Sequence, residues 1–354
     1  MSESKNRKDE HIKYSHAQFS SQSTAFDDCQ VVHNSIGKVN FKDIDLSIEL
    51  WGRKFPAPFY INAMTGGSKK SLEVNRKLAQ LAKSSGLMMA TGSISSAIRN
   101  PELAPSFTIV REENPYGFVL ANVGAEQSLE NAKRAIDLIQ ADALQIHLNV
   151  PEEMIMPEGD NEFKFYKDNL FHLVQNLDIP IVVKEVGFGM SRETIDELIK
   201  LGVENIDISG SGGTNFIKVE NERRSEKEFN YLENFGQSTL ISLLEAQDFI
   251  DQANIIASGG IKNPYDVVKC LSLGAKACGM SAYYLNQVLN FDIELAIENI
   301  QKFNQELKTL MTIFNAKKIS ELRNLDLVIS GYSRDWCQAR GIDYSKLARR
   351  KLQL

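Results

Sequence analysis

Eight short apolar segments recur along the chain, and each ends in small or polar residues. They are FYINAMTG at 59–66, LMMATGS at 87–93, FVLANVG at 118–124, ALQIHLN at 143–149, IVVKEVG at 181–187, NIDISGSGG at 205–213, IIASGGI at 255–261 and ACGMSAY at 277–283. Each is too short for a helix and is nearly continuous in its hydrophobicity. This pattern is typical of strands that are buried on both faces of a parallel sheet.

Amphipathic segments with helix-capping residues lie between these strands. We expect helices over 71–86, 128–140, 191–202 and 263–275, and a further helix over 293–314 after the last strand. Serine or asparagine at the start and glycine at the end are the usual caps of such helices. Eight strands alternating with helices predict an α/β fold, a closed (β/α)8 TIM barrel. The alternative is an open doubly wound sheet, but no GxGxxG motif follows the first strand.

The barrel core is expected at about 59–290, within a single domain that spans the whole chain. An N-terminal extension of about 1–58 precedes it, and a helical C-terminal extension of about 291–354 follows it. Two connections are unusually long, at 150–165 after the fourth strand and at 214–236 after the sixth. Both follow the carboxyl ends of strands, which is the face where barrels carry out their chemistry.

Composition narrows the class of protein. The 354 residues are 43% hydrophobic and 24% charged, with a formal net charge of -6, so a general nucleic-acid binder is not expected. No apolar run approaches the ~18 residues of a membrane span, and the polar start MSESKNRKDEH does not resemble a signal peptide. Four cysteines without a CxxC pair favour the reducing cytoplasm. We therefore expect a cytoplasmic protein that acts on a small molecule.

The clearest local signal is a pair of glycine-bearing segments at the ends of the last two strands. SGGI at 258–261 precedes a helix, and GMSA at 279–282 ends the next strand. Glycine lets backbone N–H groups approach an anion, and a helix N-terminus adds partial positive charge. Barrels often hold a phosphate in the loops after strands seven and eight. The alternative is that these are tight turns without a ligand.

Lys184 indicates what kind of phosphate-bearing ligand these loops would bind. It lies within the apolar strand IVVKEVG, where a charged group needs an anionic or electron-rich partner. The N1–C2=O edge of a reduced flavin is such a partner, and a bridge to Asp207 is the alternative. The segment 209–216 adds backbone donors and Thr214, while MTGG at 64–67, with Ser93 and Asn122, offers small groups at the same mouth. These residues favour FMN over a phosphorylated substrate alone.

Two further groups suggest how a substrate is held. His147 and Asn149 end the fourth strand and precede Glu152 and Glu153, which are residues suited to substrate binding and proton transfer. Carboxylate and diphosphate oxygens form the ligand set that Mg²⁺ prefers. The segment RKDEH at 7–11 is either a solvated tail or a clamp for a diphosphate.

Together these motifs resemble those of a known family. RKDEH (7–11), MTGG (64–67), HLN (147–149) with PEGD (157–160), GGTNF (212–216) and SGGI (258–261) occur here in the order seen in type 2 isopentenyl diphosphate isomerases, which are FMN-dependent barrels. The resemblance extends from about residue 7 to about residue 340. SGGI is shared by many FMN barrels, whereas RKDEH combined with HLN and PEGD is specific.

The resemblance implies isomerisation of isopentenyl diphosphate to dimethylallyl diphosphate, with reduced FMN, NADPH as the reductant, Mg²⁺ and a homotetramer or homo-octamer. It implies substrate binding by Arg7, Lys8, His11, His147, Asn149 and Glu152, of which His147 and Glu152 are also catalytic, and metal binding by Glu153. It implies FMN binding by Met64, Thr65, Gly66, Ser93, Asn122, Lys184, Ser209, Thr214, Gly259, Gly260, Met280 and Ser281.

One residue departs from the family pattern. Members usually have glutamine near the alkene of the substrate, where this chain has Glu152. A carboxylate there can form a hydrogen bond, move a proton or impair catalysis. Two other functions remain open: an FMN-dependent oxidoreductase of the 2-hydroxy acid oxidase or dehydrogenase type, although its His and Arg pair is not found, and a binding module without catalysis.

Overall fold

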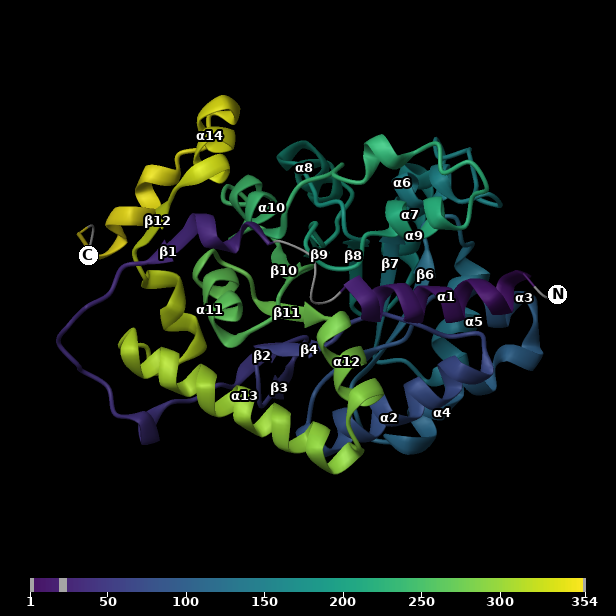
Figure 1. The fold of residues 1–354 in the computed structure, drawn as a ribbon, viewed down its shortest axis with the longest axis horizontal. Helices are drawn as coiled ribbons and strands as arrows, with labels where there is room; N and C mark the ends of the chain where they lie inside the picture. Colours follow the sequence, from purple (N-terminus) through teal and green to yellow (C-terminus); the bar gives the residue numbers. More distant parts are fainter. Residues whose placement is uncertain (1–2, 19–23, 353–354) are drawn as a thin grey trace.

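The computed structural model describes residues 3–18 and 24–352, and a closed barrel of eight parallel strands stands at its centre (Figure 1). Strand β11 pairs with β4 and closes the ring, so the open sheet is excluded. The eight strands are β4 (Phe59–Ile61), β5 (Met89–Ala90), β6 (Val119–Gly124), β7 (Ala143–Leu148), β8 (Ile181–Glu185), β9 (Asn205–Asp207), β10 (Asn254–Ser258) and β11 (Ala277–Met280).

The expected helices are present with small shifts at their ends. They are α2 (Lys69–Ser85), α5 (Leu129–Ile139), α8 (Arg192–Lys200), α11 (Pro264–Ser272) and α13 (Ile293–Ile313). The side chains of Ser128, Ser191 and Asn263 accept hydrogen bonds from the first turn of their helices, and Gly86 ends α2 at a φ of 66°. None of the described helices is both long and apolar enough to cross a bilayer.

Other elements were not anticipated from the sequence pattern. The additional helices are α3 (Ser95–Arg99), α4 (Pro105–Glu113), α6 (Val150–Ile155), α7 (Tyr166–Asn176), α9 (Phe216–Glu222), α10 (Thr239–Glu245), α12 (Ala282–Asn290) and α14 (Gly331–Arg340). The 3-10 helices are η1 (Ala25–Asp28), η2 (Phe41–Asp43), η3 (Pro101–Leu103), η4 (Asn230–Leu232), η5 (Ile319–Asn324) and η6 (Tyr344–Leu352). The two long connections are therefore partly helical, because α6 and α9 lie within them.

The two extensions of the barrel are joined to each other. Strand β1 (Cys29–Val31) pairs antiparallel with β12 (Leu327–Ile329), and β2 (Ile48–Leu50) forms a hairpin with β3 (Arg53–Phe55). The Lys269 ammonium of α11 holds η1, directly before β1, since it donates to the Phe26 carbonyl at 2.8 Å; it also lies 4.2 Å from the centre of the Tyr265 ring on its own helix.

Helix α1 (Glu3–Gln18) packs against α2, α9 and α12, and lies on the right-hand side of Figure 1, opposite β12 and α14. Lys8, His11, Ser15 and Gln18 recur at helical spacing, and all four are buried. Ser15 Oγ lies 2.6 Å from Thr214 Oγ1, and Gln18 Oε1 accepts the Asn215 N–H. The segment that contains RKDEH is therefore a packed helix in the structure and not a solvated tail.

Candidate active site

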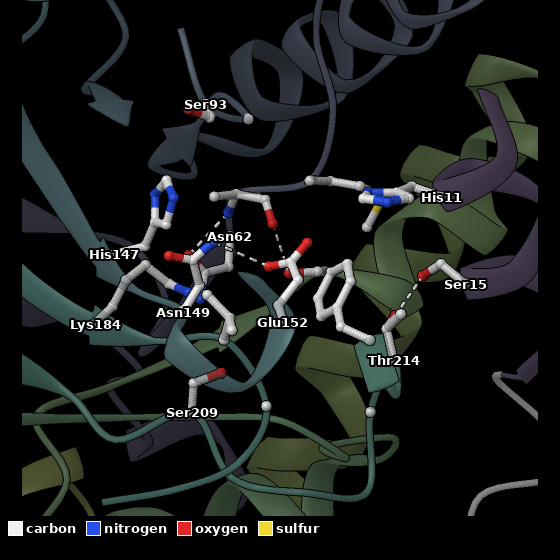
Figure 2. Close-up of a pocket in the computed structure, with 18 of the residues that line it drawn as sticks. His11, Ser15, Asn62, Ser93, His147, Asn149, Glu152, Lys184, Ser209 and Thr214 are labelled. Atoms are coloured by element: carbon white, nitrogen blue, oxygen red, sulfur yellow. Dashed lines mark hydrogen bonds between the residues drawn. The ribbon is translucent and has the colours of Figure 1, made fainter. Parts of the chain in front are cut away.

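A cavity of about 590 Å³ opens at the carboxyl ends of the barrel strands, beneath α1. This volume is typical of small-molecule sites. In the view of Figure 2, Glu152 lies between His147, Asn149 and Lys184 on one side and His11 on the other. Most of the predicted site residues line the cavity: Lys8, His11, Met64, Ser93, Asn122, His147, Asn149, Glu152, Glu153, Lys184, Ser209, Thr214, Gly259, Gly260, Met280 and Ser281.

Three predicted residues are not among those lining residues. The Thr65 side chain is buried behind the wall, and its hydroxyl lies 2.7 Å from Ser71 Oγ. Gly66 packs against Phe107, whose ring lies 2.0 Å from the position that a Cβ would take. Contact of these two residues with a cofactor stays a prediction. Arg7 belongs to α1, but its side chain lies outside the described residues.

In the glycine-containing loops after β9 and β10, main chain packs directly against main chain, and we call this surface the glycine cradle. Gly259 and Gly260 have φ values of 93° and 71°, which glycine adopts without strain. A Cβ on Gly259 would lie 1.9 Å from the Gly210 carbonyl oxygen, and a Cβ on Gly213 would lie 3.1 Å from the Gly260 nitrogen. Side chains are therefore excluded here, which leaves main-chain groups to face the cavity, as an anion site requires.

The helix N-terminus at this site is that of α12 and not that of α11. Asn263 Oδ1 already accepts the N–H groups of Tyr265 and Asp266, and Asp266 accepts the Lys262 N–H. The first turn of α11 is thus satisfied internally. In contrast, the Ser281 side chain makes no capping bond to α12, and no acidic residue lies in the first turn of α12. The open helix N-terminus on the cavity is therefore that of α12, and a contribution from the helix after SGGI stays a prediction.

We predict that Gly259→Ala lowers the free energy of unfolding by about 2–4 kcal/mol, because the new methyl group meets a main-chain oxygen and the φ is unfavourable for alanine. Gly37→Ala is a suitable control, since nothing lies within 4 Å of its Cβ position. Urea unfolding measures both variants, and equal stabilities would contradict the prediction.

Lys184 is a buried cation on the wall of the cavity. Only 6% of the residue is exposed, and its ammonium donates to the Glu185 carbonyl oxygen at 2.6 Å. Among the described residues no ion pair joins it to Asp207, so the alternative of a bridge to that carboxylate is not observed. A buried ammonium without a carboxylate partner is unfavourable unless an anionic ligand balances its charge.

The neighbouring Glu185 organises the turn after β8, a role that the sequence analysis did not assign. Its Oε2 accepts the N–H groups of Val186, Gly187 and Phe188 at 2.6, 2.7 and 2.5 Å. Burial raises the pKa of Glu185 to about 8, although the three N–H groups and Lys184 act in the opposite direction. Because Val186 and Gly187 line the cavity, Glu185 helps to shape its wall.

Asn149 connects the end of β7 to the acidic side chains of α6. Its Nδ2 donates to Glu153 Oε1 at 2.8 Å and to Glu152 Oε2 at 3.4 Å, while Glu153 Oε2 accepts the Asp160 N–H. Its Oδ1 is buried without a hydrogen-bond partner within the described part of the chain. An orphaned amide oxygen beside a carboxylate suits a hard cation or a ligand donor. Nearby, burial raises the pKa of Glu126, with further contributions from Glu153 and Asp160.

A second group of charges lies between α1 and α9 and was missed from the sequence. His11 Nε2 lies 2.6 Å from Oε1 of the fully buried Glu220, and Arg223 pairs with Glu220 and with Glu158. One ligand atom each from His11, Glu152 and Glu220 lies within 4.8 Å of the others, the one such grouping that could hold a metal in the described ranges. It does not include Glu153. The run VENERR after GGTNF was its only trace in the sequence.

Comparisons with known proteins identify the family of the chain. Residues 110–328 match the family model for FMN-dependent dehydrogenase. The chain is 47% identical over 337 residues to the isopentenyl-diphosphate delta-isomerase of Staphylococcus haemolyticus, covering 95% of this chain and 97% of the relative. It is 44% identical over 345 residues to the enzyme of the same name from Staphylococcus epidermidis, covering 98% and 99%.

Solved structures are similar at the level of the fold. The flavin-binding domain of baker's yeast flavocytochrome b2 has a TM-score of 0.66 at 16% identity, covering 87% of this chain and 81% of that one. A mandelate oxidase mutant with a monooxide FMN adduct has a TM-score of 0.63 at 15% identity, covering 89% and 92%. Because the sequence relatives match at far higher identity over nearly the full length, the chain belongs to the isopentenyl-diphosphate delta-isomerase family and is an isomerase.

Proposed function

We propose that this isomerase interconverts isopentenyl and dimethylallyl diphosphate, with reduced FMN and Mg²⁺ in the cavity beneath α1. The proposal depends above all on Lys184, a buried ammonium that faces the cavity and has no carboxylate partner among the described residues. A cavity that combines this cation with a glycine cradle and an uncapped helix N-terminus suits a cofactor with both an anionic ring edge and a phosphate.

The observed residues fit FMN in two places. The cradle of Gly259 and Gly260, with the N-terminus of α12 at Ser281, would hold the phosphate through main-chain N–H groups. Lys184 would stabilise negative charge on the ring. When bound, reduced FMN supplies an electron-rich ring and a nitrogen that can exchange a proton beside the substrate.

The substrate diphosphate would lie beneath α1, where Lys8 and His11 line the cavity. Arg7 is proposed for the same task, although its side chain lies outside the described residues. On the other side, the Glu153 carboxylate and the orphaned Asn149 Oδ1 would hold Mg²⁺ together with diphosphate oxygens. Mg²⁺ usually binds in this way, through one or two carboxylates and the phosphates of the substrate.

Glu152 and His147 are the proposed catalytic residues. An allylic C–H is too weak an acid for a side-chain base, so a proton must reach the alkene before another leaves. Glu152 would contact the alkene end of the substrate, because its carboxylate lies between Asn149 and the His11–Glu220 pair. His147 lines the same cavity next to Asn122, and would accept or return a proton at its ring nitrogen.

An anaerobic assay tests the proposal. The protein is incubated with isopentenyl diphosphate, FMN, Mg²⁺ and dithionite, and the product is followed by NMR. Dimethylallyl diphosphate should form with reduced FMN and not with oxidised FMN. Steady consumption of NADPH with an organic acceptor, without isomerisation, would instead indicate an FMN-dependent oxidoreductase.

Replacement of Glu152 tests its role. We expect Glu152→Gln to keep kcat within about tenfold, because the amide can still form hydrogen bonds, and to lower KM severalfold by removing a negative charge near the diphosphate. Glu152→Ala should lose about 10²-fold in kcat. Steady-state kinetics distinguish the two variants. An equal loss in both would assign the transferred proton to the carboxylate itself.

We also infer that the chain works in the reducing cytoplasm as one domain with its barrel core at about 59–290, and assembles as a homotetramer or homo-octamer that uses NADPH to reduce FMN. All four cysteines are free and buried, which is consistent with a reducing compartment. Light scattering of the purified protein measures the assembly, and anaerobic stopped-flow spectroscopy compares NADPH with NADH.

A further inference from the structure

A chain of hydrogen-bonded side chains runs beneath the cavity from His147 to Asp207. Its members stand in or directly after barrel strands, and all but His147 are buried. His147 Nδ1 lies 2.9 Å from Asn122 Oδ1, Asn122 Nδ2 donates to Gln145 Oε1 at 3.2 Å, Gln145 Nε2 donates to Asn62 Oδ1 at 2.9 Å, and Asn62 Nδ2 donates to Asp207 Oδ2 at 2.9 Å.

The direction of the chain is set at its Asp207 end. A carboxylate only accepts hydrogen bonds, and Asp207 Oδ1 already accepts from the Ser258 hydroxyl at 2.6 Å and from the Ser209 N–H at 3.2 Å. The amide group of Asn62 must therefore point its Nδ2 at Asp207. The Ala63 N–H, which donates to Asn62 Oδ1 at 2.8 Å, agrees with this orientation.

The orientation of Asn62 fixes the orientation of each following side-chain amide. Asn62 Oδ1 is an acceptor, so Gln145 must present its Nε2 to it and its Oε1 to Asn122. Asn122 then presents its Nδ2 to Gln145 and its Oδ1 to His147. Since an amide oxygen cannot donate, Nδ1 of His147 must carry the proton in this contact.

We infer that Asp207 is a positioning residue for the reaction, which acts through Asn62, Gln145 and Asn122 to hold neutral His147 as its Nδ1–H tautomer. Nε2 is then the unprotonated nitrogen, the one able to take a proton from substrate or cofactor. The catalytic consequence rests on the proposed function of His147, whereas the tautomer itself follows from the hydrogen-bond geometry alone.

The chain leaves little room for reorientation. A Cβ on Gly279 would lie 2.5 Å from Asn62 Nδ2 and 3.0 Å from the Tyr60 hydroxyl. Strand β11 can therefore approach these groups this closely only because residue 279 is glycine. If these side chains only satisfied one another's hydrogen bonds in a densely packed interior, removing one would lower the stability of the protein and leave the His147 tautomer unchanged. A directional chain predicts instead that a change at Asp207 alters the ring of His147.

The experiment is ¹⁵N NMR of the FMN-loaded protein labelled at histidine, at an alkaline pH where an ordinary imidazole is neutral. The chain has five histidines, so His147→Gln assigns the signals of His147 by difference. We expect the pattern of the Nδ1–H tautomer in the unmodified protein, with Nε2 unprotonated. A His147 ring protonated at Nε2 would overturn the inference.

Asp207→Asn tests the origin of this preference, because the new amide turns an N–H₂ group against either Asn62 or Ser209 and removes the fixed acceptor. The Nε2–H tautomer of His147 should then become populated. Asn122→Asp added to this variant should restore the Nδ1–H tautomer, since a carboxylate next to His147 only accepts. Unchanged spectra in Asp207→Asn, or no rescue by Asn122→Asp, would contradict the inference.

Tyr60→Phe is the matched control. The Tyr60 hydroxyl lies 3.4 Å from Gln145 Nε2 and also interacts with Asp207, but neither contact sets the orientation of an amide in the chain, so its loss should leave His147 unchanged. If Asp207→Asn does not fold, Gln145→Met interrupts the same chain at its centre and should give the same shift of tautomer.

Kinetics give the second readout. With flavin content measured by absorbance, Asp207→Asn should lower kcat about 10–100-fold with little change in KM, the range found for residues that orient a catalytic group. The NMR result does not depend on isomerisation. A failure of the proposed function would therefore leave the tautomer measurable, and a wrong tautomer would refute this inference alone.

Discussion

Lys184→Met is expected to stabilise the FMN-free protein and to weaken the FMN-loaded one. Without a ligand, the variant removes a buried ammonium whose hydrogen-bond acceptor is the Glu185 carbonyl oxygen, so the free energy of unfolding should rise by about 1–3 kcal/mol. With FMN, the same change removes the cation proposed for the ring. We expect at least ~100-fold weaker FMN binding, about 3 kcal/mol for a lost charge-assisted contact.

The gain in the FMN-free protein should depend on pH. The pKa of Glu185 is about 8, so below that pH its carboxyl is mostly protonated and does not need Lys184. As the pH rises through 8, Glu185 ionises, and the loss of Lys184 then removes a favourable charge interaction. The stabilisation should therefore be largest near pH 7 and should shrink above pH 8.

Urea unfolding with and without FMN, at two pH values, measures both effects of Lys184→Met. Lys200→Met is the control, because Lys200 is an exposed lysine paired with Asp196 on α8, where an ion pair contributes little. Destabilisation of the FMN-free protein by Lys184→Met would show that the ammonium is already satisfied without a ligand.

Glu153→Gln is expected to have the largest effect on metal dependence. The carboxylate is the proposed Mg²⁺ ligand, and we expect a loss of about 10²–10³-fold in kcat/KM, because an amide lacks the charge that holds the ion. Glutamine can also keep only one of the two hydrogen bonds that Glu153 accepts, from Asn149 Nδ2 and from the Asp160 N–H. The start of α6 should therefore loosen as well.

The activity of this variant is titrated with Mg²⁺ and compared with Glu162→Gln, a change at an exposed residue of the same connection. The control should keep the Mg²⁺ dependence of the unmodified protein. If Glu153→Gln requires the same Mg²⁺ concentration, the ion is held elsewhere, and the grouping of His11, Glu152 and Glu220 becomes the first place to examine.

The barrel and most of the site could be predicted because both follow from local patterns. A buried parallel strand has the sequence pattern of a short apolar run, and the carboxyl ends of eight such strands lie on one face of the barrel. Residues such as Lys184, Asn149 and Gly259, each at the end of a strand or just within it, therefore had to lie around one cavity.

What could not be predicted depends on contacts between distant segments. The partner of His11 is Glu220 in another connection, and the direction of the chain from His147 to Asp207 depends on three amide orientations. Periodicity carries no information about such pairings.

The pairing of β1 with β12 has a consequence for the order in which the protein matures. Cys29 finds its strand partner only when Ile329 has been synthesised, after all eight barrel strands. Helix α1 precedes β1, and its buried face needs α9 and α12 in place. Helix α1 is therefore synthesised before the elements that hold it over the cavity, and its packed position requires that α12 has already been made.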